Sequence, residues 1–255
     1  MTARSLGDFS PSSDLLPPCT LGGLWAVRHG QSTANVAFAA AQASGSTVPV
    51  PGRDRDVPLS ELGTAQGAAL GGWLADQAPG AGPDLVVCSP YLRARQTWEA
   101  MADRAAELGT PRLDVLVDER LRDREMGIFE LHPPAALQAR APHEAARREL
   151  LGEWTYRPPG GEAFTDVAVR VGQFVCDLGR AAPGRRVLLV AHDGVVIALR
   201  YVLAGIGATA PEQLPPVPNA SVSSWNGDGH RLRLATWGDT AHLTSTDSTE
   251  GMIRV

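Results

Sequence analysis

Two short stretches of the chain combine the pattern of a buried strand with a histidine. The apolar residues 24–27 run directly into Arg28 and His29, and residues 186–191 run into His192. In an open parallel sheet, ligands bind beyond the carboxyl ends of the strands. A histidine and an arginine presented at such a strand end are placed to meet an anion.

A third apolar stretch, residues 84–88, is followed by Ser89 and then by a helix with Arg93 in its first turn. The helix dipole disfavours a guanidinium there, so Arg93 is best explained by an anion bound at that helix N-terminus. A phosphoryl group matches forked guanidinium donors. An arginine next to a histidine more often serves structure than chemistry when it stands alone. The three stretches together predict a cationic pocket.

The elements that must position these residues alternate between strand and helix. Helices are expected over residues 60–78, 91–108, 164–178 and 195–204, and further strands over 113–117, 221–225 and 231–237. Ser89 is expected to cap the second helix, with Pro90 at its first position. The alternation predicts a three-layer α/β/α fold with a doubly wound, mostly parallel sheet and a C-terminal β-hairpin.

The remaining segments give the expected domain organisation. Residues 1–20 mix Ser, Pro, Asp and Leu, which is typical of a poorly ordered arm, and residues 21–255 are expected to form a single domain. Residues 132–159 predict a helical insertion, and residues 45–57 predict a loop whose charged side chains face solvent. Arg124 is expected to form a surface ion pair.

Composition limits the classes of partner. The chain has 255 residues, 44% of them hydrophobic and 20% charged, with a net charge of −5, which disfavours nucleic-acid binding through a broad basic face. Cys19, Cys88 and Cys176 show neither a metal-ligand spacing nor a disulfide framework. Neither a signal peptide nor an apolar run of membrane-spanning length is apparent. We therefore expect a soluble cytoplasmic protein that binds neither membrane nor nucleic acid.

Three motifs in this chain resemble those of the histidine phosphatase superfamily, in its phosphoglycerate mutase-like branch. Arg28-His29-Gly30 with Asn35 is similar to the family's R-H-G-x-x-x-x-N opening. Residues 89–97 resemble its S-x-x-x-R-A-x-x-T segment, and residues 191–194 resemble its second-histidine motif. Each motif stands at an expected strand-to-helix junction and the order is that of the family, so the combination is specific.

The resemblance implies that His29 is the nucleophile and attacks phosphorus to form a phosphohistidine. Arg28, Arg93 and His192 would hold the non-bridging oxygens of the phosphoryl group. Further contacts with the substrate are expected of Asn35, Gly30, Ser89, Gly194 and Glu125. Neither a metal nor an organic cofactor is implied.

The proton donor for the leaving alcohol has three candidates. Residues 121–130 are similar to the family's L-x-E-x-x-x-G-x-x-E-G segment, which puts Asp123 where the donor glutamate stands. Glu125 stands two residues further on and has the longer reach. Asp193 follows the second histidine, where the acid-phosphatase branch keeps its donor. We rank Asp123 first, Glu125 second and Asp193 third.

The leading hypothesis is a phosphatase that acts on a small phosphorylated metabolite. A phosphoglycerate mutase is the alternative within enzymes, although the family's mutases carry E-R-H-Y-G where this chain has D-R-E-M-G over residues 123–127. The other alternative is a phospho-ligand-binding module without turnover. The identity of the substrate and the oligomeric state do not follow from the sequence.

Overall fold

The computed structural model describes residues 16–244, and within them six strands form one sheet in the order β3-β2-β4-β1-β5-β6. The strands are β1 (Gly23–Arg28), β2 (Leu85–Cys88), β3 (Val115–Val117), β4 (Arg186–Ala191), β5 (Val222–Gly227) and β6 (Leu232–Asp239). Strands β1 to β4 run parallel to one another. The β5-β6 hairpin adds to β1 in antiparallel orientation. The predicted sheet and its C-terminal hairpin are confirmed.

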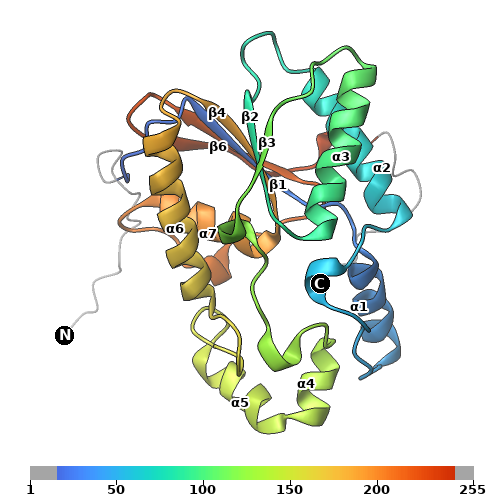
Figure 1. Ribbon diagram of the computed structural model, residues 1–255. Helices are drawn as coiled ribbons and strands as arrows, with labels where there is room; N and C mark the ends of the chain where they lie inside the picture. The colour runs from blue at the N-terminus through green and yellow to red at the C-terminus, as the bar shows by residue number, and fades with distance from the viewer. Residues whose placement is uncertain (1–15, 245–255) are drawn as a thin grey trace, which may run out of the picture.

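Helices cover both faces of this sheet. The α-helices of the described residues are α1 (Thr33–Ser44), α2 (Glu61–Ala75), α3 (Leu92–Glu107), α4 (Pro134–Arg140), α5 (Pro142–Leu151), α6 (Phe164–Ala181) and α7 (Asp193–Ala204), and four of them cover the sheet. Helices α2 and α3 lie on one face, and α6 and α7 lie on the other (Figure 1). Successive side chains of β4 point to opposite faces of the sheet. Val187 and Leu189 pack with α6 and α7. Leu188 and Val190 pack with α2 and α3. This is the predicted three-layer fold.

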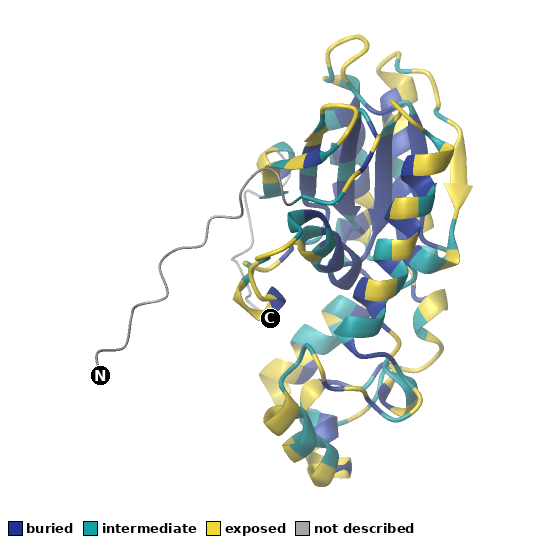
Figure 2. Cartoon of the chain, turned by 90° about the vertical axis from the view of Figure 1, so that its left-hand side faces the viewer, coloured by how far each residue is buried: buried dark blue, intermediate teal, exposed yellow. Residues whose placement is uncertain are grey.

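The segments outside the three layers lie at the ends of the strands. Helices α4 and α5 occupy the expected insertion, away from the sheet, and are exposed over much of their surface (Figure 2). Within the expected N-terminal arm, Cys19 is buried and its amide donates to the carbonyl of His230, while residues 1–15 lie outside the described residues. None of the helices in residues 16–244 combines the length and hydropathy needed to span a bilayer.

The register of the parallel strands brings the predicted site residues together. Arg28 at the end of β1 pairs with Ala191 at the end of β4, so His29 and His192 emerge side by side. On the other side of β4, the amide of Ser89 donates to the carbonyl of Val190 at 2.9 Å. Residues far apart in the chain therefore meet at one edge of the sheet.

Candidate active site

His29 is buried and has a defined tautomer. Its Nδ1 lies 2.7 Å from the carbonyl oxygen of Gly30, and because a carbonyl only accepts, Nδ1 carries the proton. Its Nε2 accepts a hydrogen bond from Nε of Arg93 at 3.2 Å. Burial lowers the pKa of His29 well below its ordinary value, and the charges of Arg93 and Arg28 lower it further. The imidazole is therefore neutral, with its lone pair on Nε2.

Arg93, from the first turn of α3, lies between His29 and two carboxylates. Its Nη2 donates to Oδ2 of Asp123 at 2.7 Å. Both Nη atoms also bind the carboxylate of Asp54, at 3.0 and 3.1 Å. The side chain is 4% exposed, so these ion pairs neutralise a buried charge.

His192 is fully buried at the N-cap of α7, and its ring centroid lies 5.1 Å from that of His29. Its Nε2 lies 2.8 Å from Oγ of Ser89, while its Nδ1 lies 3.2 Å from Oδ2 of Asp123 without the geometry of a hydrogen bond. Burial lowers the pKa of His192, although the nearby Asp123 acts in the opposite direction. Ser89 thus orients the second histidine.

Asp123 is the carboxylate nearest the two histidines. Its Oδ1 accepts from the backbone N–H of Arg124 at 2.8 Å, and its Oδ2 faces Arg93 and His192. Burial alone would raise the pKa of Asp123, but the neighbouring His192 and, after it, Arg93 hold this pKa well below its usual range. In this state Asp123 is ionised.

Arg28 stands on the other side of His29, at the end of β1. Its Nη1 donates to the carbonyl of Val217 at 2.6 Å, and its Nη2 lies 3.3 Å from Oδ2 of Asp193. Its Nε is buried and has no hydrogen-bond partner in the described part of the chain. A buried N–H without a partner is costly, so a ligand atom is expected to satisfy it.

Some predicted substrate contacts are already used by the protein itself. Oδ1 of Asn35 accepts from the amide and hydroxyl of Ser32 and caps α1. The amide of Gly30 donates to Oγ1 of Thr97, and the amide of Gly194 donates to Asp193. These groups hold the histidine loops in place, and their contact with a substrate stays a prediction.

Three expectations need correction. Ser89 does not cap the following helix, because α3 begins at Leu92 with Tyr91 as its N-cap residue and the Ser89 hydroxyl is engaged by His192. Pro90 therefore lies before the helix rather than at its first position. Arg124 forms no surface ion pair: it is buried, and it donates to the carbonyls of Tyr156 and Glu162 and pairs with Glu153.

The Glu125 side chain forms neither a hydrogen bond nor an ion pair with the two histidines. Its side chain is half exposed and pairs with Nε of Arg122 at 3.3 Å. Its backbone is tied to Glu162, which accepts from the amide of Glu125 at 3.2 Å and also pairs with Arg122 and Arg170. A substrate contact or a proton-donating role for Glu125 stays a prediction.

Two contributions to the site were not found from the sequence. Asp54 was expected in a solvated loop, and no local pattern separates it from the exposed Asp56 two residues later. Asn219 donates to the carbonyl of His29 at 3.1 Å, and Val217 accepts from Arg28. For Val217 and Asn219 the sequence did offer a signal, the proline-rich segment 215–218 just before a strand. Prolines fix an irregular backbone, whose free carbonyls and neighbouring side chains can contact the site.

His29, Asp123 and His192 also offer nitrogen and oxygen atoms within 4.8 Å of one another, a spacing that could hold a metal ion. Arg93 donates to the lone pairs of both His29 Nε2 and Asp123 Oδ2, however, and so occupies this space with positive charge. The arrangement suits an oxyanion better than a cation.

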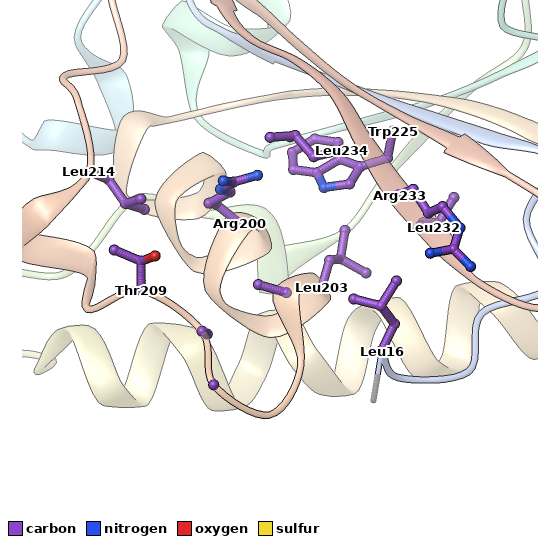
Figure 3. Close-up of a pocket in the computed structure, with 12 residues that line it drawn as sticks. Leu16, Arg200, Leu203, Thr209, Leu214, Trp225, Leu232, Arg233 and Leu234 are labelled. Carbon is purple, nitrogen blue, oxygen red and sulfur yellow. The ribbon is translucent and has the colours of Figure 1, made fainter. Parts of the chain in front are cut away.

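A separate cavity of about 300 Å³ lies between α7 and the β5-β6 hairpin (Figure 3). Leu203, Trp225 and Leu232 line it, together with Arg200 and Arg233. Its lining includes none of Arg28, His29, Arg93 and His192, so this cavity is not where the predicted chemistry would occur.

Comparisons with known proteins agree with this geometry. Residues 24–240 match the model of the histidine phosphatase superfamily, branch 1. Glucosyl-3-phosphoglycerate phosphatase of Mycobacterium tuberculosis is 31% identical over 86% of this chain and 95% of its own length. A probable phosphoglycerate mutase of Proteus mirabilis is 29% identical over 87% of this chain and 94% of its own.

Solved structures give the same result. A mycobacterial glucosyl-3-phosphoglycerate phosphatase in complex with VO3 has a TM-score of 0.67 and 32% identity, covering 86% of this chain and 99% of the other. The fold, the strand-end histidines and the extent of the match lead to one conclusion: this chain belongs to the histidine phosphatase superfamily, branch 1.

Proposed function

We propose that the protein hydrolyses phosphomonoesters of a small metabolite through a phosphohistidine on Nε2 of His29. One observation carries this proposal. The Gly30 carbonyl fixes the proton on Nδ1, at 2.7 Å, and leaves the lone pair on Nε2 beside Arg93. A nucleophilic imidazole needs an unprotonated nitrogen next to the charges that will hold the phosphoryl oxygens.

Buried donors surround the position that the phosphoryl group would take. Nε of Arg28 and Nδ1 of His192 lack hydrogen-bond partners in residues 16–244, and Arg93 points at the same space. The Ser89 hydroxyl accepts from the amide of Tyr91, so its own proton is free for Nε2 of His192. This leaves the proton of His192 on Nδ1, where it can be donated to a phosphoryl oxygen.

The reaction would proceed in two balanced steps. Nε2 of His29 attacks phosphorus, the bond from phosphorus to the ester oxygen breaks, and the departing oxygen receives a proton from Asp123. Asp123 then takes a proton from water as the water attacks the phosphohistidine, and the P–N bond breaks to release phosphate. His29 and protonated Asp123 are regenerated.

Asp123 must be protonated to serve as the acid, although it is ionised in the empty site. A phosphoryl dianion bound between His29 and Arg93 supplies the change. Its negative charge lies close to the Asp123 carboxylate, which Arg93 holds near His29, and so raises the pKa of Asp123. We prefer Asp123 to Glu125 and Asp193 because its carboxylate lies beside His192, at 3.2 Å, and beside the Arg93 that contacts His29, whereas the other two pair with Arg122 and Arg28.

The relatives include both phosphatases, which hydrolyse a phosphate ester, and probable mutases, which transfer the phosphoryl group. The mycobacterial relative is a phosphatase, whereas the relative from Proteus mirabilis is a probable mutase. We propose hydrolysis because residues 123–127 depart from the mutase pattern. We also propose a cytoplasmic location, since Cys19, Cys88 and Cys176 are all free thiols. The substrate class we propose is that named by the mycobacterial phosphatase, a glucosylated phosphoglycerate.

The test is turnover of p-nitrophenyl phosphate and of both phosphoglycerates by the protein and by its His29→Ala variant. We expect phosphate release, an acid-labile phosphoenzyme on rapid quenching, and loss of both in His29→Ala. His230→Ala is the matched control, because His230 is an exposed histidine in the hairpin turn. Interconversion of the phosphoglycerates without phosphate release would show a mutase, and turnover that survives His29→Ala would reject the nucleophile.

A further inference from the structure

Every N–H of the Arg93 guanidinium already has a partner within the protein. Its Nε donates to His29, and its Nη2 donates to Asp123 and to one oxygen of Asp54. Its Nη1 donates to the other carboxylate oxygen of Asp54, at 3.0 Å, and to the Asp54 carbonyl, at 2.6 Å. A guanidinium has no further donors to offer. An incoming phosphoryl group can therefore bind Arg93 only by displacing one of these acceptors.

Attack by His29 would free Nε of Arg93, but the two Nη atoms would stay occupied, and of their two carboxylate acceptors Asp54 has the weaker hold. Asp123 is also bonded to the backbone of Arg124 and faces His192. The carboxylate of Asp54, in contrast, forms hydrogen bonds and ion pairs with Arg93 alone among the described residues. Its bidentate geometry is also the geometry in which a phosphoryl group binds a guanidinium.

The segment around Asp54 is held through its backbone, so the Asp54 carboxylate itself is not needed to keep the segment in place. Asp54–Asp56 is a single 3-10 turn between Gly52, which has a φ of +107°, and Val57, which is buried. The turn is connected to the insertion through the amide of Asp54, which donates to Glu130. A carboxylate on such a turn can withdraw without moving α3 or the sheet.

We propose that Asp54 is an internal competitor for the phosphoryl site. In the empty protein its carboxylate occupies the fork of Arg93 and compensates that buried charge; when a phosphoryl group binds, the two anions repel and the Asp54 carboxylate leaves. Asp54 thereby lowers the affinity for phosphoryl ligands, including the phosphate product. The identity of the ligand rests on the proposed function, whereas the competition itself follows from the contacts of Arg93.

The experiment measures binding of inorganic phosphate by isothermal titration calorimetry to the full chain and to Asp54→Asn. If the paired state makes up nine-tenths or more of the empty protein, removing the competing charge tightens phosphate binding at least about tenfold. Asp56→Asn is the matched control: it removes the same charge from the same turn, and Asp56 is exposed and makes no contact with Arg93. Asp54→Ala repeats the test with a side chain that cannot form any hydrogen bond to Arg93. Thermal unfolding checks that each variant is folded.

Tighter phosphate binding by Asp54→Asn and Asp54→Ala, with Asp56→Asn unchanged, supports the proposal. Equal or weaker binding by the Asp54 variants overturns it, since Asp54 would then serve to position Arg93 for the ligand. An equal gain in Asp56→Asn, or no phosphate binding by any form, also overturns it. Calorimetry needs no turnover, so phosphate binding without hydrolysis would reject the proposed function and leave this inference standing.

Discussion

Replacing Asp123 by asparagine separates the chemistry of this residue from its structural contacts. The amide keeps the shape of the side chain and can still accept from the backbone N–H of Arg124 through Oδ1. Arg93 keeps its bidentate partner Asp54. Ground-state structure is therefore largely preserved, and the main loss is the ability to give a proton to the departing oxygen.

The size of that loss depends on the leaving group. A positioned general acid contributes about 10²–10⁴ in rate, which corresponds to about 3–5 kcal/mol of transition-state stabilisation. A sugar or glycerate alkoxide needs the whole of this contribution. p-Nitrophenolate leaves as a stable anion and needs little of it. We expect Asp123→Asn to slow transfer from an alkyl phosphate by about 10²–10⁴ and transfer from p-nitrophenyl phosphate by less than about tenfold.

The assay is single-turnover quenched flow with enzyme in excess, which follows formation of the phosphoenzyme and is blind to its hydrolysis. Glu125→Gln and Asp193→Asn are the matched controls, because each removes one carboxylate that is paired with a different arginine. Equal losses on the two substrates in Asp123→Asn would refute the assignment. A leaving-group-dependent loss in either control variant would move the role to that residue.

Three further outcomes follow from the site. Because the pKa of His29 is lowered well below 6.5, its lone pair stays available as the pH falls from about 8 to 6.5. In Asp123→Asn, which removes the titrating acid, kcat/KM for p-nitrophenyl phosphate, corrected for substrate ionisation, should therefore stay level over this range. A fall to half its value by pH 6.5 in that variant would contradict this. Ser89→Ala removes the hydroxyl that orients His192 and should lower kcat about 10–100-fold with little change in KM; an unchanged kcat would show that His192 needs no such support. Gly30→Ala would push a methyl group into the backbone of α2, and should lower the free energy of urea unfolding by about 1–3 kcal/mol or more. Gly72→Ala is the control: it lies within α2, its added methyl group meets nothing within 4 Å, and it should raise that free energy by up to about 1 kcal/mol.

Much of the fold and part of the site could be predicted because they depend on local pattern. The strands β1, β2 and β4 are continuous apolar runs, as expected of strands buried on both faces, and each ends at a change to polar residues. Once a parallel sheet is assumed, the ends of these strands must lie together. That is why His29, Arg93 and His192 were placed at one edge without knowledge of the strand order.

The partners of these residues depend on long-range packing, which a single sequence does not encode locally. Asp54 reaches Arg93 across 39 positions, and Asn219 reaches the carbonyl of His29 across 190. Arg124 sits in a run of charged residues that resembles a solvated face, yet it is buried because carbonyls from distant segments converge on it. Ser89 precedes a helix as a capping residue would, but His192 takes its hydroxyl.

The buried Arg124 has a consequence for protein engineering. Its backbone N–H holds Oδ1 of Asp123, while its side chain reaches the carbonyl of Tyr156 and the carboxylate of Glu153, at the end of the insertion. An insertion grafted from another member of the superfamily, in order to change the preferred substrate, would remove both of those acceptors. The graft would then leave the buried guanidinium with the carbonyl of Glu162 alone and loosen the segment that holds the carboxylate we assign to proton transfer. Exchange of the insertion should therefore succeed only when residues equivalent to Glu153 and Tyr156 are transferred with it.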